Sequence, residues 1–201
     1  MSKETLSASG ARIRGDDYQH LVAWCQALRA LQQGSDITTV GVEDPDPSIG
    51  NADDITVYRR GGRNEFYQVK SSVDAKEPLN CTWLTAPSPS GGPSILQRLH
   101  EAWQNLTHNG QFPNLFLITN KLIDPTDPVI ALLDGRDGTV ARQLREARRK
   151  SDAGKMRRQL ASHFSIEETK LIEFLKDMHF RVGKLHEEWE EYAATLMYAL
   201  G

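Results

Sequence analysis

The chain has 201 residues, of which 39% are hydrophobic and 25% are charged, and its formal net charge is −3. This length and composition suit one globular domain with a hydrophobic core and, at most, a helical appendage. Apolar runs stay well below the roughly 18 residues of a membrane span, and two cysteines are too few for a disulfide framework. We therefore expect no membrane partner and a location in the reducing cytoplasm.

The first half of the chain predicts one helix and three strands. Residues 1–13 are polar and are expected to be flexible, and a helix is predicted from Asp16, as its N-cap, to about residue 33. A strand is predicted over 37–43, followed by a turn-rich loop over 44–51. Strands over 53–58 and 65–70 flank a glycine-containing turn and predict a β-hairpin.

The second half predicts a long loop, a helix, a buried strand and then a mainly helical end. The loop covers 73–93, the helix 94–107 and the strand 114–120. Later helices are expected at 128–134, 138–150, 152–163, 166–178 and 186–200, with a small strand at 180–182. This order predicts an α/β (or α+β) fold, in which helices flank one mixed sheet. We place the core at 14–150 and a helical C-terminal part at 151–201.

Three polar residues of the hairpin have the types and spacing found in metal-dependent nucleases. Asp54 begins the first strand, whereas Gln68 and Lys70 lie two apart on the second and so share a face. Tyr67 and Val69 then point toward the core. Hydrolysis of a phosphodiester with Mg²⁺ needs oxygen ligands for the cation and a positive charge near the attacking water or the developing phosphorane.

These requirements assign a candidate role to each residue. Asp54 is the main metal ligand, and Glu43, at the end of the preceding strand, is the best second carboxylate. Gln68 can offer its amide oxygen and Val69 its backbone carbonyl, while Lys70 positions and polarises the water. The expected cofactor is Mg²⁺, with Mn²⁺ able to substitute. Glu43 also has a simpler interpretation as an exposed acid at the end of a strand.

The length of the hairpin loop decides whether these side chains can meet. A two-residue Gly61-Gly62 turn pairs Asp54 with Val69 and turns Asp54 to the wrong face. A three-residue loop over 61–63 instead pairs Asp54 with Lys70. We therefore predict a three-residue loop with a glycine at positive φ, or an equivalent bulge.

Four short motifs surround the hairpin residues: RGDDYQ at 14–19, Val42-Glu43 followed by Asp53-Asp54-Ile55, YQVKS at 67–71 and, more weakly, FLITN at 116–120. Together they resemble the PD-(D/E)XK nuclease superfamily in its D…QxK form. They resemble, more specifically, the N-terminal double-stranded-DNA endonuclease domain of CD-NTase-associated effectors (CBASS/SAVED type) in bacterial anti-phage defence. Gln68 stands where the superfamily usually has a second acid, so Glu43 or Asp53 becomes more important as a candidate second carboxylate.

The resemblance implies a restriction-endonuclease-like fold and an endonuclease that cuts double-stranded DNA. It also implies a supporting role for Tyr18 and Gln19 in the first helix. Such domains are usually fused to a sensor or a signalling ATPase, so residues 151–201 either pack on the core or lead to such a domain. A C-terminal sensor or ATPase domain, or a separate activating protein, is thus an expected partner. Cutting both strands needs two sites, which favours a homo-oligomer as the active form.

Basic residues in two segments are candidates for contact with DNA phosphates. Between residues 136 and 158 there are nine lysines and arginines against three acids. The candidates are Arg59, Arg60 and Arg63 at the hairpin tip, with Arg142, Arg145 and Arg149 in the basic segment. Charge-rich surfaces of this kind are more often only solvated. Two alternative functions on this core remain: a catalytically inactive nuclease-fold module that binds DNA or scaffolds a complex, and an RNA-directed nuclease. A third alternative is a mostly structural oligomerisation domain driven by the helices after Asp152.

Overall fold

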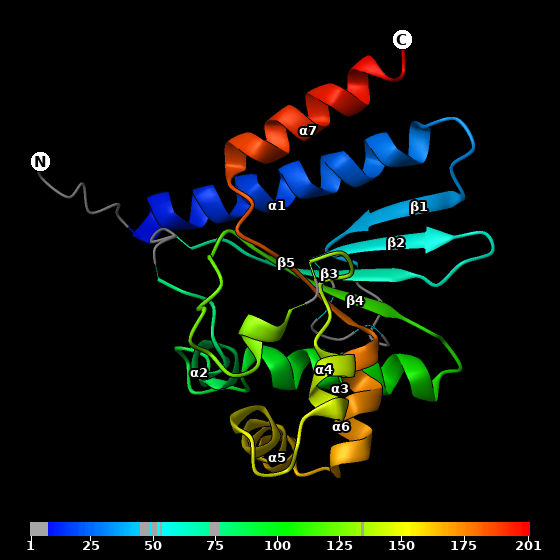
Figure 1. Cartoon of the computed structure of the whole chain (residues 1–201). Helices are drawn as coiled ribbons and strands as arrows, with labels where there is room; N and C mark the ends of the chain where they lie inside the picture. Colours follow the sequence, from blue (N-terminus) through cyan, green and yellow to red (C-terminus); the bar gives the residue numbers. More distant parts are fainter. Residues whose placement is uncertain (1–7, 45–48, 50–51, 53, 73–76, 134) are drawn as a thin grey trace, which may run out of the picture.

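Five strands form one mixed sheet at the centre of the molecule (Figure 1). The computed structural model describes residues 8–44, 49, 52, 54–72, 77–133 and 135–201. The strands lie across the sheet in chain order and are β1 (Ile37–Val42), β2 (Ile55–Arg59), β3 (Glu65–Lys70), β4 (Asn114–Thr119) and β5 (Met178–Val182). β1 to β3 pair antiparallel, whereas β3, β4 and β5 pair parallel through helical crossovers. The predicted α/β fold with a mixed sheet is therefore confirmed.

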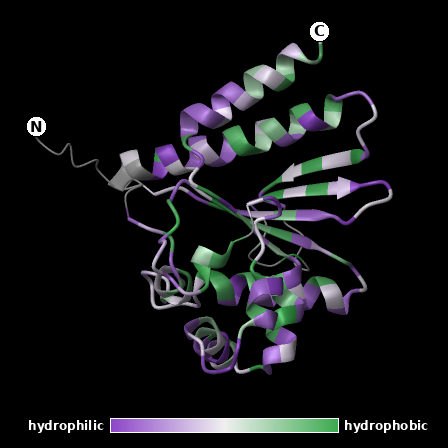
Figure 2. Cartoon of the chain, viewed as in Figure 1, coloured by the Kyte–Doolittle hydropathy of each residue, from purple (hydrophilic) through white to green (hydrophobic). Residues whose placement is uncertain are grey.

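Alternating side chains along the central strands divide the hydrophobic core into two halves. Ile55, Val57 and Tyr67 point to one face of the sheet, whereas Phe66 and Leu115 point to the other. The alternation of hydrophobic and hydrophilic residues is visible along β1 and β2 (Figure 2). Because successive side chains of a strand point to opposite faces, this pattern fixes which hairpin residues can share a site.

Two helices lie side by side over one face of the sheet, α1 (Ala8–Leu31) and α7 (His186–Tyr198) (Figure 1). The Tyr18 hydroxyl donates to the Lys184 carbonyl at 2.7 Å and accepts from the Trp189 indole N–H at 3.0 Å. Burial raises the pKa of Tyr18 to about 12, so this hydroxyl stays protonated. These bonds fasten the start of α7 to the middle of α1.

The other face carries the remaining helices (Figure 1). They are α2 (Cys81–Thr85), α3 (Ile95–His108), the short 3-10 helix η1 (Ile130–Leu132), α4 (Ala141–Glu146), α5 (Asp152–Phe164) and α6 (Glu168–Lys176). α3 begins at Ser94, whose side chain accepts a hydrogen bond from the Gln97 backbone while the Gln97 side chain bonds back to Ser94. This capping box satisfies two backbone donors that the helix itself leaves free.

The first helix starts earlier than the sequence pattern predicts. α1 begins at Ala8, so residues 8–13 are helical rather than flexible, and Asp16 lies inside the helix instead of capping it. The first turns carry glycines and no continuous apolar stripe, which is why periodicity does not reveal them. Residues 1–7, the rest of the expected flexible terminus, lie outside the described residues.

The C-terminal part contributes directly to the sheet and its cover. β5 pairs with β4 from Leu115↔Met178 to Thr119↔Val182, and α7 packs against α1. The core that we expected to end near residue 150 therefore continues to the end of α7. The predicted loop over 73–93 also contains a short helix, α2. Within the described residues, none of the helices combines the length and hydropathy of a membrane span.

Candidate active site

The β2–β3 hairpin has a longer loop than predicted, and its register differs by two residues. The strands pair Ile55 with Tyr67 and Thr56 with Phe66, and extending this register places Asp54 opposite Gln68. The loop covers 60–64, and neither Gly61 nor Gly62 has a positive φ. The predicted three-residue loop with a positive-φ glycine is therefore wrong. A shift of two residues nevertheless keeps every side chain on its face, so Asp54 still lies on the same face as Gln68 and Lys70.

The Asp54 carboxylate is the point at which the hairpin residues converge. Its Oδ2 atom accepts a hydrogen bond from the Val69 backbone N–H at 2.7 Å and another from the Gln68 amide Nε2. The Lys70 Nζ lies 3.7 Å from the same oxygen. The side chains of Asp54 and Lys70 are 18% and 33% exposed, so both groups are reachable by a ligand while remaining partly screened from water.

The oxygen atoms around Asp54 suit a hard cation that keeps several waters. The Val69 N–H points toward the end of β2, where it donates to Asp54, and the C=O of a strand residue points to the same side as its N–H. Rotation of the Gln68 amide by half a turn would present its oxygen in place of its nitrogen. The donors are thus one carboxylate, one amide and one carbonyl, a set typical of Mg²⁺ rather than zinc. Among the described residues, no group of three or more His, Cys, Asp or Glu side chains could hold a metal.

The other expected site residues differ in whether they contact Asp54. Glu43 has a left-handed backbone (φ 50°), and its N–H donates to the Asp54 carbonyl at 3.2 Å, while its side chain is exposed. The Gln19 amide from α1 donates to the same carbonyl at 3.4 Å. Tyr18 lies instead in the core beneath α7, where its hydroxyl is bonded to Lys184 and Trp189. Asp53 lies outside the described residues.

Two further polar residues near the hairpin were not singled out from the sequence. The Asp44 carboxylate accepts hydrogen bonds from the hydroxyls of Thr56 and Tyr58, both at 3.1 Å, and Thr56 shares the face of Asp54. Asn120 bonds to the backbone of Ser72 twice, with Nδ2 donating to the carbonyl and Oδ1 accepting from the N–H, both at 2.8 Å. Asn120 is the last residue of the FLITN motif, so the motif could have indicated its role. Asp44 begins a turn-rich segment, and nothing in that segment indicated that its side chain bonds to β2.

The basic residues of the hairpin tip are mostly engaged within the protein. Arg59 pairs with Asp36 and Glu65, and Arg63 donates to the Pro113 carbonyl at 2.8 Å and to Asp177 at 2.6 Å. Arg60 is exposed at the loop. The tip therefore offers fewer available charges than its sequence predicts.

The second basic segment keeps more of its charge at the surface. Arg142 and Arg145 are 78% and 59% exposed, although both approach Glu146. Arg149 is also exposed. Arg157, by contrast, is 13% exposed and donates to Glu168 at 2.5 Å, so it serves the packing of α5 against its neighbours.

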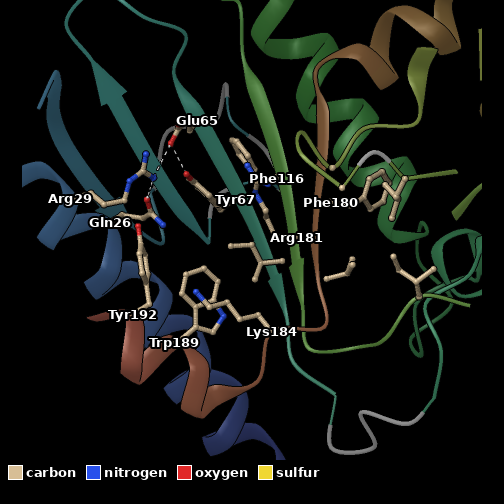
Figure 3. Close-up of a pocket in the computed structure, with 16 residues that line it drawn as sticks. Gln26, Arg29, Glu65, Tyr67, Phe116, Phe180, Arg181, Lys184, Trp189 and Tyr192 are labelled. Atoms are coloured by element: carbon tan, nitrogen blue, oxygen red, sulfur yellow. Dashed lines mark hydrogen bonds and ion pairs between the residues drawn. The ribbon is translucent and has the colours of Figure 1, made fainter. Parts of the chain in front are cut away.

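A cavity of about 540 Å³ lies on the opposite face of the sheet from Asp54. Tyr67 and Phe116 form part of its floor, and side chains of α1 and α7 form its wall (Figure 3). Because Asp54 and Gln68 point to the other face, this cavity is not part of the hairpin site.

The fold and the site describe an α/β domain with a carboxylate, an amide and a lysine gathered at one end of a β-hairpin. The protein family described as "Cap4, dsDNA endonuclease domain" matches residues 12–176. The chain belongs to this family, whose description names a double-stranded-DNA endonuclease domain, so the predicted family is confirmed.

Structural similarity is weaker than the family match. No curated protein matches the chain. Among solved structures, the Acinetobacter baumannii Cap4 SAVED/CARF-domain containing receptor is 13% identical, with a TM-score of 0.46, and the match covers 98% of this chain and 37% of that one. The same receptor with the cyclic trinucleotide 2'3'3'-cAAA is 12% identical, with a TM-score of 0.45, over 99% of this chain and 37% of that one. The chain thus spans little more than a third of these receptors.

Proposed function

We propose that the β2–β3 hairpin holds a magnesium-dependent active site of the PD-(D/E)XK type, in which Gln68 replaces the usual second acid. The observation that carries this proposal is the convergence of the Gln68 amide, the Val69 N–H and the Lys70 ammonium on one oxygen of Asp54. An ion pair with a purely structural role would also bring Lys70 and Asp54 together. Such a pair would not need to be partly exposed, nor to lie beside a backbone carbonyl and an amide.

The oxygen atoms of Asp54, Gln68 and Val69 are the candidate metal ligands, and Glu43 is the candidate second carboxylate. When bound, Mg²⁺ would supply a Lewis acid for the phosphate oxygens and for the attacking water, and Mn²⁺ should substitute. Lys70 holds a positive charge beside this position and stabilises the negative charge that develops as the water oxygen attacks phosphorus. Asp54 keeps the ammonium oriented through their contact at 3.7 Å.

The test is cleavage of supercoiled plasmid by the purified chain with added MgCl₂, with MnCl₂ or with EDTA. Asp54→Asn and Lys70→Met preserve side-chain size, and each should slow cleavage by roughly 10²-fold or more. Lys170→Met is the matched control, because Lys170 is 63% exposed on α6 and, among the described residues, its ion pair is with Glu173 on its own helix. Unchanged cleavage by Asp54→Asn and Lys70→Met would show that the hairpin is not the active site.

Parallel reactions separate the two alternative functions. Structured RNA incubated beside the plasmid tests for an RNA-directed nuclease, which would degrade the RNA faster than the DNA. A chain that shifts DNA in a gel but cuts neither substrate with any metal would be an inactive binding module. Glu43→Gln tests the second carboxylate, since loss of a metal ligand should raise the Mg²⁺ concentration needed for half-maximal rate.

We further propose that the domain acts as an effector in bacterial anti-phage defence, together with a sensor that brings copies of it together. The support is the resemblance of its motifs to nuclease domains of CD-NTase-associated effectors. Two active sites are needed to cut both strands, so an oligomer should be the active form. Cleavage that rises steeply with protein concentration, measured beside light scattering, would support this; a monomer that makes double-strand breaks at a concentration-independent specific rate would contradict it.

A further inference from the structure

The cavity behind the sheet has the size of a small-ligand site. Its volume of about 540 Å³ lies within the usual range of roughly 300–1,000 Å³ for such sites. β3, β4 and β5 supply its floor, and residues of α1 and α7 close it from one side (Figure 3). Nothing in the hairpin site accounts for it, because the two lie on opposite faces.

The charges around the cavity do not balance. Three of its lining residues are basic, Arg29, Arg181 and Lys184, and one is acidic, Glu65. Glu65 Oε1 accepts from Arg59 at 2.8 Å, and the other Glu65 oxygen lies 3.8 Å from Arg29. Arg59 also pairs with Asp36, so these two arginines and two acids balance one another, and Arg181 and Lys184 remain. The lining therefore carries an excess of positive charge.

Two of the three cations lack a carboxylate within ion-pair distance among the described residues. The Lys184 ammonium lies over the rings of Trp189 and Tyr192, 3.8 Å and 4.3 Å from their centroids. The Arg181 guanidinium lies 5.7 Å from the Phe116 centroid. Burial lowers the pKa of Lys184 despite smaller opposing contributions from Cys25 and then Glu188. An anion in the cavity would restore the balance.

The lining also limits what kind of anion fits. Guanidinium and ammonium groups together recognise phosphate oxygens well, and the aromatic walls suit a flat apolar ring. Gln26 adds an amide that can both donate and accept hydrogen bonds. A DNA duplex is too large to enter a cavity of about 540 Å³.

We propose that this cavity binds a phosphate ester of mononucleotide size, either a free nucleotide or the phosphorylated 5′ end of a single DNA strand. Arg181 and Lys184 hold the phosphate, and the side of the cavity formed by Trp189 and Tyr192 contacts the rest of the ligand. The site does not depend on the hairpin chemistry and would persist if the hairpin proved inactive.

The test is calorimetry with the whole purified chain in EDTA, which excludes metal-assisted binding at Asp54. The probes are dAMP, inorganic phosphate and a short single-stranded oligonucleotide with either a 5′-phosphate or a 5′-hydroxyl. Arg181→Gln and Lys184→Gln should each weaken binding of dAMP or of the phosphorylated strand by roughly tenfold. Lys155→Gln, at an exposed lysine of α5 paired with Asp152, is the control and should bind as the unmodified chain does.

The probes distinguish the source of the ligand. Tight dAMP binding identifies a nucleotide site, whereas preference for the 5′-phosphorylated strand over its 5′-hydroxyl twin identifies a strand-end site. Thermal unfolding without ligand checks the stability of Lys184→Gln, which loses the contacts with the two rings. Arg181 is exposed, so Arg181→Gln should stay folded and can test the proposal even if Lys184→Gln is unstable. Absence of binding by any probe, or equal binding by Arg181→Gln and the unmodified chain, overturns the proposal.

Discussion

Asn120 provides a sharp test of how the fold positions Lys70. The parallel pairing of β3 with β4 ends at Lys70↔Thr119, and the Asn120 side chain then takes over with two hydrogen bonds to the Ser72 backbone, both at 2.8 Å. Ser72 lies two residues beyond Lys70. We therefore predict that Asn120 fixes the direction in which the chain leaves β3 and, with it, the position of the Lys70 side chain.

The expected magnitude follows from these two bonds. Each contributes about 0.5–1.5 kcal/mol net, so Asn120→Ala should cost about 1–3 kcal/mol, mostly in the segment after β3. A displacement of about 1 Å in a catalytic group can cost roughly 10²-fold in rate. Single-turnover plasmid cleavage by Asn120→Ala should therefore be about 10- to 100-fold slower at saturating DNA, with little change in DNA affinity, because Asn120 need not touch the substrate.

Two variants separate positioning from general instability. Asn120→Asp keeps the oxygen that accepts from the Ser72 N–H but loses the amide donor, so its rate should be intermediate. Asn109→Ala changes an exposed asparagine at the C-cap of α3 and should leave the rate unchanged. Chemical denaturation gives the stability of each variant. An Asn120→Ala protein that is destabilised yet cleaves at the normal rate would refute the link between Asn120 and Lys70.

Three further predictions concern the stability of the fold. Gly41→Ala would place a Cβ atom 2.5 Å from Thr56 Oγ1, and the repacking should cost about 1–3 kcal/mol, seen as a fall in Tm; an unchanged Tm would contradict the close approach. Burial lowers the pKa of His100 in the folded protein, so the unfolded chain binds a proton more readily. The free energy of unfolding should therefore fall as the pH drops below about 6.5. In urea titrations at pH 7 and pH 5.5, His100→Phe should reduce that fall. Arg157→Met leaves Glu168 and nearby carbonyls without their donor and should lower the free energy of unfolding by about 2–4 kcal/mol. Arg157→Lys should restore little of this loss. An unchanged free energy of unfolding would show that the pair is dispensable.

Local patterns predicted the elements that position the site. Period-2 alternation and the glycines between two strands indicated the hairpin, and the continuously apolar segment at 114–120 indicated a covered strand, which is β4 (Asn114–Thr119). Because the face of a side chain depends only on the parity of the register, Asp54, Gln68 and Lys70 lie on one face of the hairpin although its loop is longer than predicted.

Long-range pairings could not be read in the same way. Asn64 Oδ1 accepts from the Arg59 N–H at 3.1 Å, which helps to set a five-residue loop that glycine content alone did not suggest. The partners of Arg63 are far away in sequence, at 112–113 and Asp177, so local composition could not show that this guanidinium is bonded within the protein. The start of α1 was likewise missed, because its first turns have no apolar face for periodicity to detect.

The amide at residue 68 has a physical consequence for the carboxylate beside it. Gln68 is buried and donates to Asp54 Oδ2, so the two side chains attract one another without a cation or an extra proton. A glutamate at this position would place a second negative charge against Asp54, and one carboxyl would tend to stay protonated until a cation arrived. With glutamine, the carboxylate is held in place by the chain itself, so in the site we propose an arriving Mg²⁺ would have to compete with the Gln68 amide and Lys70 for the same oxygen. On that proposal, the hairpin would be a preformed site of weaker metal affinity than one with a second acid, and Lys70 would provide the positive charge beside Asp54.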